Sequence, residues 1–389
     1  AFYAGKFKTN DKLVGTDKKF AAEVQRLLEG ATYLSIQGAE TKAKELPEGE
    51  GREEAYGKVA ERFAKFQSDF ADSSYADEAT FSAVLIYNRA DELDHAIRMS
   101  EIFRSTYEPK LLKGPKGRRS AEQKKKDAEQ RSQSLDIIQR NHLLLAEFYE
   151  RIADFKTSAG LYDEFFDKYP SHEKASIALY NGAVYYQGLG EIDVAIDKFN
   201  TYEDDFAEGG EKVDVYWRVC GLQETKEDWE AASQCYNQFR KEYAKASPAK
   251  IFESRYKYAV ILDEKLGKRK DAMKEYSWLV SEYPKLTPEE QKTEGAQRAG
   301  AHARFEVLEP EFKRWAAITF KRLDKKTLNM KLGGAQTLAC VSTDDAKCDA
   351  EGRYLDVLSY GNGDFGICAL TRIGQVYRNV ADTFRNAPI

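Results

Sequence analysis

The sequence predicts an all-α protein, a solenoid of antiparallel helix pairs with a helical C-terminal extension. One observation is an aromatic ladder that recurs about every 37 residues, with large side chains four, seven and eleven positions after a small residue. Another is a stripe nine and twelve positions before that same residue. Both spacings are those of one face of a helix, whereas a strand would alternate every second residue.

The ladder predicts the second helix of each pair, because its offsets trace a single apolar stripe. Its six small residues are Val59, Ala96, Ser158, Ala195, Ala232 and Ala272. After Ala195, for example, come Phe199, Tyr202 and Phe206. The longer gap between Ala96 and Ser158 predicts an insertion.

The upstream stripe predicts the first helix of each pair, as at Ala183 and Tyr186. Gly190 and Gly267 fall between the two stripes. At a helix C-cap the backbone takes a positive φ, which glycine adopts without strain. Each unit is therefore expected to be two antiparallel helices joined by a short turn.

Hydroxyl and proline residues predict where several helices begin and end. Ser247 precedes Pro248, and Thr287 precedes Pro288 with a glutamate at residue 290, which is the pattern of an N-cap and, in the second case, a capping box. Pro170 follows a ladder that it cannot continue.

The domain organisation follows from these signals. We expect an N-terminal helical cap at 1–54, the first repeat units at 55–107, a basic insertion and helix extension at 108–140, further units at 141–288 and a C-terminal helical region at 289–389. In that last region helices are expected to break near Pro310, and 333–352 is expected to be a loop. A final helix from about Ile367 carries Leu370, Gly374 and Tyr377, the pattern of a first helix with no second helix after it. Together with an Ala at position 1, this predicts a piece of a longer protein.

Composition excludes several classes of protein. The 389 residues include 60 Lys and Arg against 65 Asp and Glu, a net charge of −5, so bulk attraction to nucleic acid is not expected. An aromatic content of 12% argues against disorder. No apolar run approaches the roughly 18 residues that a membrane helix needs.

No constellation in the sequence indicates catalysis, so we expect a non-enzymatic protein without metal, cofactor or small-molecule substrate. The four histidines fall in different repeats without ligand spacing, and no phosphate loop or nucleophile motif occurs. They are His95, His142, His172 and His302. An acidic cluster near residues 344–351 lacks the order of a calcium loop. An enzyme that uses the C-terminal thiols is the low-weight alternative.

The five cysteines fall into two groups. Cys220 and Cys235 lie in helical patterns and are expected to be small buried apolar residues. Cys340 and Cys348 enclose a short loop, and in an oxidising compartment a disulfide there would stabilise by roughly 2 to 3 kcal/mol. Cys368 competes for either partner, and in the cytosol all these thiols would be free.

The repeat resembles the tetratricopeptide repeat (TPR). The resemblance is carried by Leu179, Ala183 and Tyr186 in one helix, by Ala195, Phe199 and Tyr202 in the next, and by Tyr169-Pro170 at the end of a unit. The local sequence at residues 165–170 and 70–79 resembles the TPR subtype found in periplasmic and outer-membrane-associated bacterial proteins. These include proteins of myxobacterial envelope and gliding-motility machinery. The resemblance implies a right-handed superhelix and a scaffold for other proteins in a multiprotein complex, periplasmic or envelope-associated, with a cytoplasmic location as the alternative.

In a stacked solenoid the first helices line the concave side, so we expect a partner-binding groove there for a peptide or helix. Positions three before and one after each small residue face inward. The candidates are Phe81, Leu85, Leu143, Glu147, Tyr180, Val184, Trp217, Gly221, Lys257 and Ile261, with Arg218 beside them. This lining is expected to be mostly apolar and aromatic; burial of the same residues by neighbouring helices is the alternative.

The insertion offers a second functional hypothesis. Its basic residues include Lys116, Arg118, Arg119, Lys124, Lys125 and Lys126. One interpretation is an electrostatic adaptor that contacts anionic lipid or nucleic acid, although the absence of aromatic residues disfavours stacking on bases. The other is a solvated helix extension, with membrane contact only indirect and nucleic acid not a partner.

Overall fold

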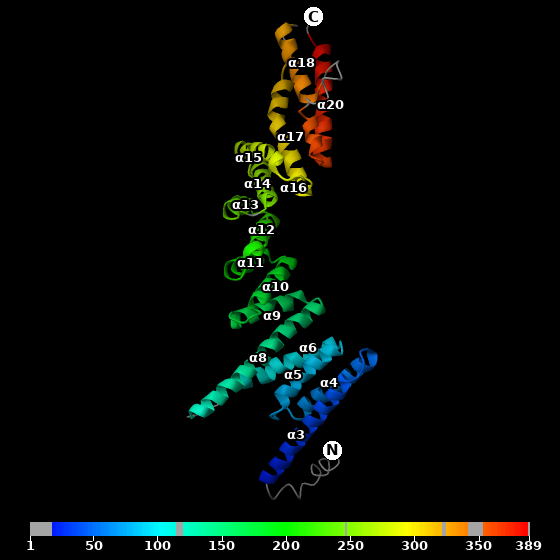
Figure 1. The fold of residues 1–389 in the computed structure, drawn as a ribbon, viewed down its shortest axis with the longest axis vertical. Helices are drawn as coiled ribbons and strands as arrows, with labels where there is room; N and C mark the ends of the chain where they lie inside the picture. Colours follow the sequence, from blue (N-terminus) through cyan, green and yellow to red (C-terminus); the bar gives the residue numbers. More distant parts are fainter. Residues whose placement is uncertain (1–17, 114–119, 246, 321–323, 341–352, 388–389) are drawn as a thin grey trace. The chain divides into compact units, whose positions relative to one another are not determined.

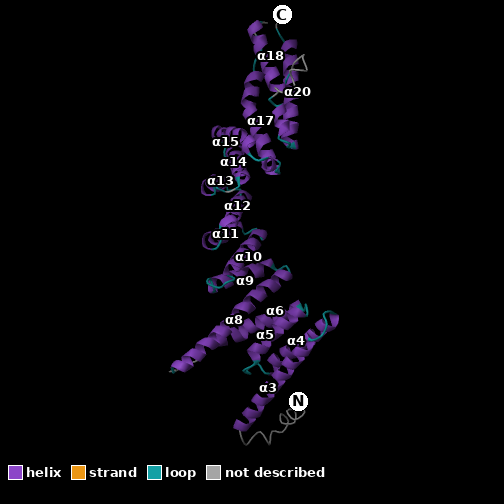
Figure 2. Cartoon of the chain, in the orientation of Figure 1, coloured by secondary structure: helices purple, strands orange, loops and turns teal. Residues whose placement is uncertain are grey.

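The computed structural model of the chain describes residues 18–113, 120–245, 247–320, 324–340 and 353–387. Within these ranges every regular element is a helix, and Figure 2 draws no strand there. The all-α prediction is confirmed. The chain divides into two compact units, Ala1–Lys198 and Phe199–Ile389, with the division inside helix α11 (Ile192–Asp205).

The first unit is a stack of helix hairpins. Its other helices are α3 (Lys18–Lys44), α4 (Glu50–Asp69), α5 (Ala76–Arg89), α6 (Leu93–Ile102), α7 (Glu108–Leu112), α8 (Ala121–Arg151), α9 (Phe155–Lys168) and α10 (Ala175–Gly188). A π-helical segment, Phe103–Tyr107, joins α6 to α7. Helices adjacent in sequence contact each other in the pairs α3 and α4, α5 and α6, and α8 and α9 (Figure 1).

The second unit continues the same arrangement and then changes it. Its helices are α12 (Gly209–Thr225), α13 (Trp229–Glu242), α14 (Pro248–Val260), α15 (Arg269–Glu282), α16 (Pro288–Gln291), α17 (Glu294–Ala316), α18 (Lys325–Ala339), α19 (Leu355–Ser359) and α20 (Gly363–Arg385). A π-helical segment, Ile261–Lys265, extends α14. The pairs α12 with α13 and α14 with α15 repeat the hairpin, whereas α17, α18, α19 and α20 form a C-terminal bundle.

The predicted ladders form the core of both units. All six small residues are buried, and Phe63, Phe165, Phe239 and Tyr276 are fully enclosed. In the pair α8 and α9 the two small positions contact directly, because the Ser158 hydroxyl donates to the Ala146 carbonyl at 3.0 Å. The helix-pair interpretation of the repeat is therefore confirmed.

The turns between paired helices share one geometry. Gly190 and Gly267 have φ values of 81° and 62°, as predicted, and Asp91, Ala153 and Glu227 take φ of 57°, 61° and 59° at the same position of their repeats. At Ala153 the turn closes with the Asp154 amide donating to the Tyr149 carbonyl at 2.9 Å, the bond of a Schellman motif. Because three of these five residues are not glycine, the positions of glycine in the sequence did not show that the turn recurs in every one of these repeats.

Predicted helix boundaries are partly confirmed. Thr287 and Glu290 form the capping box of α16, and Pro248 occupies the first turn of α14. Ser247 stands at the N-cap of α14, but its side chain makes no capping hydrogen bond, contrary to the prediction. The insertion leads into one long helix, α8, which is capped by Ser120 and runs without a break into its apolar stripe. Pro170 lies just beyond the end of α9.

Two expectations for the C-terminal region were wrong. Helix α17 is not broken near Pro310 but runs through it. A proline inside a helix costs about 3 kcal/mol, and here Leu308 and Trp315 on either side are buried in the C-terminal core. Residues 333–339 are helical, not loop, because Ala335 and Leu338 of α18 are buried in that same core.

Candidate functional site

Three helices of the second unit border a cavity. It has a volume of about 460 Å³ and lies between α12, α14 and α17. Its lining residues are Glu224, Glu253, Tyr256, Lys257, Val260, Ile261, Glu294, Gly295 and Arg298. Three carboxylates and two cations thus surround a small apolar floor. This surface is where the concave side was expected, but its lining is charged and not mostly apolar.

Glu224 is already engaged on one wall of the cavity. Its Oε1 accepts a hydrogen bond from the hydroxyl of Tyr236, and the Lys257 ammonium lies 3.1 Å from that oxygen. Burial and this hydrogen bond raise the pKa of Tyr236. The three groups form a network that fixes the Lys257 side chain against α12.

Glu253 faces the same cavity without such a partner. Burial raises the pKa of its carboxyl group, and the nearby Lys257 and Lys250 oppose that rise. No hydrogen bond or ion pair to Glu253 occurs within the described part of the chain. Gly295 of α17 leaves room for it, since a Cβ there would lie 3.4 Å from the Glu253 carboxyl carbon. A half-buried carboxylate therefore lines a cavity that a ligand group can enter.

Sequence analysis missed Glu253, Glu294 and Arg298. A signal was present for Glu253, which lies four residues before Lys257 and hence on the same helix face. No such signal marks Glu294 and Arg298, because α17 lies outside the six ladders that defined the first helices.

Three predicted groove residues are buried, and of these only Ile261 borders the cavity between α12, α14 and α17. Phe81 is 6% exposed, Leu143 7% and Ile261 2%. Phe81 packs on Phe103, whereas Leu143 and Ile261 lie in the apolar clusters around α9 and α13. The expectation of an open groove surface was wrong at Phe81 and Leu143, because packed neighbouring helices cover both side chains.

Two of the remaining candidates are held by aromatic contacts. The Trp217 ring lies edge-on to Tyr236 and Phe239, with centroids 5.2 and 5.1 Å away, and Arg218 lies 4.8 Å from the ring centroid of Phe199. Both side chains therefore stabilise the unit where they lie.

The other groove candidates are more accessible. Leu85, Tyr180, Val184 and Gly221 are half-buried, and Glu147 is exposed. Their role in binding stays a prediction.

The basic patch is only partly described. Lys124, Lys125 and Lys126 are exposed in the N-terminal part of α8, and Lys126 pairs with Glu122 at 3.1 Å. Lys116, Arg118 and Arg119 lie outside the described residues, as does the acidic cluster near residues 344–351. The electrostatic-adaptor hypothesis therefore stays a prediction.

The cysteine expectations need one correction. Cys220 and Cys235 are not free apolar residues but form a disulfide between α12 and α13, with Cα atoms 5.4 Å apart. The helix pair brings these residues together because both occupy its close crossing, at or beside the small positions. Cys340 is also disulfide-bonded, whereas Cys368 is free and exposed. Cys348 lies outside the described residues, so its pairing with Cys340 stays a prediction.

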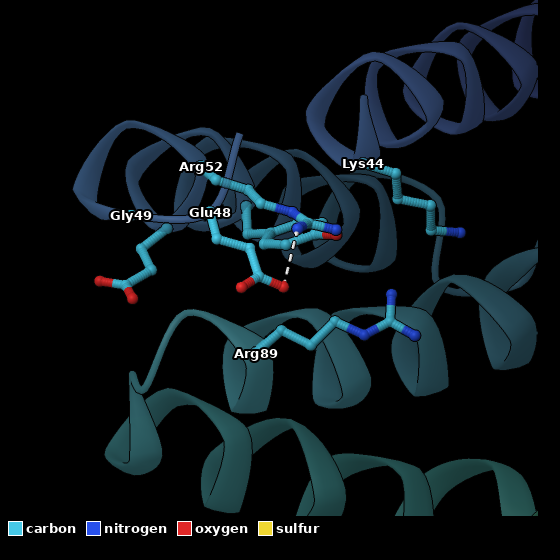
Figure 3. Close-up of a pocket in the computed structure, with 7 residues that line it drawn as sticks. Lys44, Glu48, Gly49, Arg52 and Arg89 are labelled. Atoms are coloured by element: carbon cyan, nitrogen blue, oxygen red, sulfur yellow. Dashed lines mark ion pairs between the residues drawn. The ribbon is translucent and has the colours of Figure 1, made fainter. Parts of the chain in front are cut away.

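A second cavity, of about 660 Å³, lies at one end of the first unit's helices. Figure 3 shows Lys44, Arg52 and Arg89 converging on it from α3, α4 and α5. Three carboxylates balance these three cations. Glu53 and Glu48 line the cavity, with Glu48 3.6 Å from Arg52, and Glu40 lies 2.8 Å from Lys44 and 3.5 Å from Arg89. This cavity therefore presents no net charge to a ligand.

Two of the four histidines, His142 and His172, contact the ring of Phe165, with centroid distances of 5.7 and 5.1 Å. His142 is buried, its Nε2 donating to the Leu161 carbonyl at 2.9 Å, and His302 contacts the Tyr256 hydroxyl at 3.0 Å. His95 is exposed and stacks on Tyr87. In the described ranges no three His, Cys, Asp or Glu side chains gather as a metal site would require. Nor does any described helix have the length and hydropathy to cross a membrane.

Comparisons with known proteins give similarity of fold only. No protein-family model and no curated protein sequence matches the chain. It is similar to the C-terminal part of a TPR repeat-containing protein from Cytophaga hutchinsonii, with 11% identity, a TM-score of 0.33, and coverage of 86% of this chain and 99% of that one. Human IFIT1, solved as a dimer with PPP-AAAA, gives 11% identity, a TM-score of 0.30, and coverage of 79% and 69%.

A structure of Naa15/Naa10 bound to HypK-THB gives 12% identity and a TM-score of 0.34, covering 90% of this chain and 58% of that one. These values are too low to carry an argument about function. The TPR-like fold of this chain rests on its own helix pairs, ladders and turns.

Proposed function

We propose that this protein is a non-enzymatic scaffold that binds a peptide or helix of a partner protein on the first helices of its repeats. The observation that carries the proposal is the cavity between α12, α14 and α17, which Glu253 lines without a hydrogen bond or ion pair to any described residue. A half-buried carboxylate is unfavourable until a cation or hydrogen-bond donor meets it. The bound segment would therefore present a lysine or arginine to Glu253.

The apolar part of the cavity suits such a segment. Val260 and Tyr256 lie on α14 beside Glu253 and would contact the methylene stem of a long basic side chain. Arg298, at the opposite side, would select against segments with two adjacent cations. One basic residue flanked by neutral ones is therefore the preferred motif.

We place the scaffold in an oxidising compartment, within a bacterial envelope assembly. The Cys220–Cys235 disulfide supports this location, because structural disulfides persist outside the reducing cytosol. The local sequence of the repeats supports a location in the cell envelope. A role in gliding-motility machinery is the narrower form of this hypothesis.

Site-specific photo-crosslinking in the producing cells tests the binding surface. A photoreactive amino acid replaces Glu294, which is exposed at the cavity, and in a matched variant replaces Lys270, which is exposed on α15. We expect a discrete adduct from position 294 that disappears in Glu253→Arg, and no such adduct from position 270. Equal adducts at both positions, or persistence in Glu253→Arg, would refute the site.

A further inference from the structure

Helix α20 exposes an apolar stripe along one face. Ile367 is 67% exposed, Leu370 54% and Tyr377 49%, and Gly374 and Ala381 lie on the same face. Their spacing of three and four residues keeps them in line over about 20 Å of helix. The opposite face is packed, since Ala369 and Val376 are fully buried.

The repeat itself indicates what covers such a face. Gly374 corresponds to the small residue of the other first helices, which is 0% exposed at Val84, Ala146, Ala183 and Cys220. In two of those pairs the contact with the second helix is direct, from Ser158 to Ala146 and from Cys235 to Cys220. The stripe on α20 is thus equivalent in position to the surface that a ladder helix covers on other first helices of this chain.

The charged residues beside the stripe indicate which kind of helix would cover it. Arg378 and Arg385 follow Gly374 by four and eleven residues, so they share its side of α20, and both are exposed. Asp382 lies 3.8 Å from Arg385, whereas Arg378 has no ion pair within the described residues. A covering helix with acidic residues on its flank would pair with Arg378.

We propose that the exposed face of α20 binds an acidic amphipathic helix of a partner protein, in the position that a ladder helix takes on the other first helices. That helix carries a small residue, large apolar residues four and seven positions later, and a flanking carboxylate. The site is separate from the cavity of the first helices, so it stands or falls independently of the proposed scaffold function.

The chain supplies its own probe for this site. A fluorescent peptide of residues 190–207 contains the ladder of Ala195, Phe199 and Tyr202, and Asp193, Asp197 and Glu203 to Asp205 make it acidic. We expect saturable binding to the full chain by fluorescence anisotropy, with a micromolar dissociation constant because the peptide must fold on binding. A peptide with Phe199→Ser and Tyr202→Ser is expected not to bind.

Gly374→Gln tests the face without endangering the fold. A Cβ at Gly374 meets nothing within 4 Å, so the helix tolerates the side chain while the close approach of a second helix is blocked. The matched control is Gly333→Gln on α18, where a Cβ also meets nothing. We expect an affinity loss of about tenfold for Gly374→Gln and no loss for the control.

Arg378→Glu tests the charge argument. It should weaken binding of the acidic peptide and remove most of its dependence on added salt. Unchanged affinity in Gly374→Gln would overturn the proposal. A second outcome would also overturn it. If the wild-type chain forms a dimer and Gly374→Gln dissociates that dimer, the helix that covers α20 belongs to a second copy of this chain.

Discussion

His142 is a neutral side chain that the first unit buries among charges. It is 1% exposed, and burial lowers its pKa to about 4; Glu164 opposes this shift, while Arg104 and Lys168 add to it. Its Nδ1 has no hydrogen-bond partner within the described residues. The neutral form is therefore the one that the fold accepts.

Acid should destabilise the protein through His142. In the unfolded chain its pKa is about 6.5, so between pH 6.5 and pH 4 the unfolded state binds more protons than the folded state. The stabilisation is complete above pH 6.5 and is lost as the pH falls toward 4, with roughly 2 kcal/mol lost between pH 7 and pH 5.

The measurement is urea unfolding of the wild type and of His142→Gln at pH 7 and pH 5. Glutamine keeps a donor for the Leu161 carbonyl but does not titrate, so the variant should lose less stability on acidification. His95→Gln, at an exposed position, is the control and should behave as the wild type. An equal acid response in all three proteins would show that His142 does not titrate on unfolding.

At the scale of the helix pair, the turn determines how its two helices meet. Five turns adopt the left-handed conformation at the same repeat position, two with glycine and three with a side chain. A non-glycine residue in that conformation costs about 1 to 2 kcal/mol, so packing of the paired helices holds Asp91, Ala153 and Glu227 there.

Exchanging the residues of two turns should change stability in opposite directions. We expect Ala153→Gly to raise the free energy of unfolding by about 1 kcal/mol, because the strain disappears. Gly190→Ala should lower it by a similar amount, since a Cβ at Gly190 meets nothing within 4 Å and only the φ of 81° opposes it. Denaturant midpoints of both variants test this, and two shifts of the same sign would contradict it.

At the scale of the whole molecule, stability in a repeat protein is expected to be local, because each hairpin contacts mainly its neighbours. The Cys220–Cys235 disulfide closes a loop with a sequence separation of 15 residues, which the loop-entropy relation converts to roughly 3 kcal/mol. It lies wholly within the second unit.

Removing that disulfide should loosen one unit and leave the other unchanged. In a variant with Cys220→Ala and Cys235→Ala, hydrogen exchange should become faster in α12 to α15 and stay unchanged in α4 to α6. Cys368→Ala, which alters a free exposed thiol, is the matched control. Faster exchange throughout the chain would show that the two units unfold together.

The sequence by itself determined the helices of the repeats, their pairing and the buried ladders, because a helical stripe is a local property that follows from residue spacing. It placed Ala96, Phe165 and Tyr276 in the core and Gly190 in a left-handed turn. It also identified Leu370, Gly374 and Tyr377 as the face of a first helix.

Tertiary structure decided what each face meets, since that depends on residues far away in the sequence. It buried Phe81 and Leu143, which spacing alone had assigned to a groove, and it joined Cys220 to Cys235 across a helix crossing. The cavity around Glu253 arises because α17, which carries no ladder, packs beside α14. Spacing along one helix specifies a surface, and only the packing of a second helix decides whether that surface is core or site.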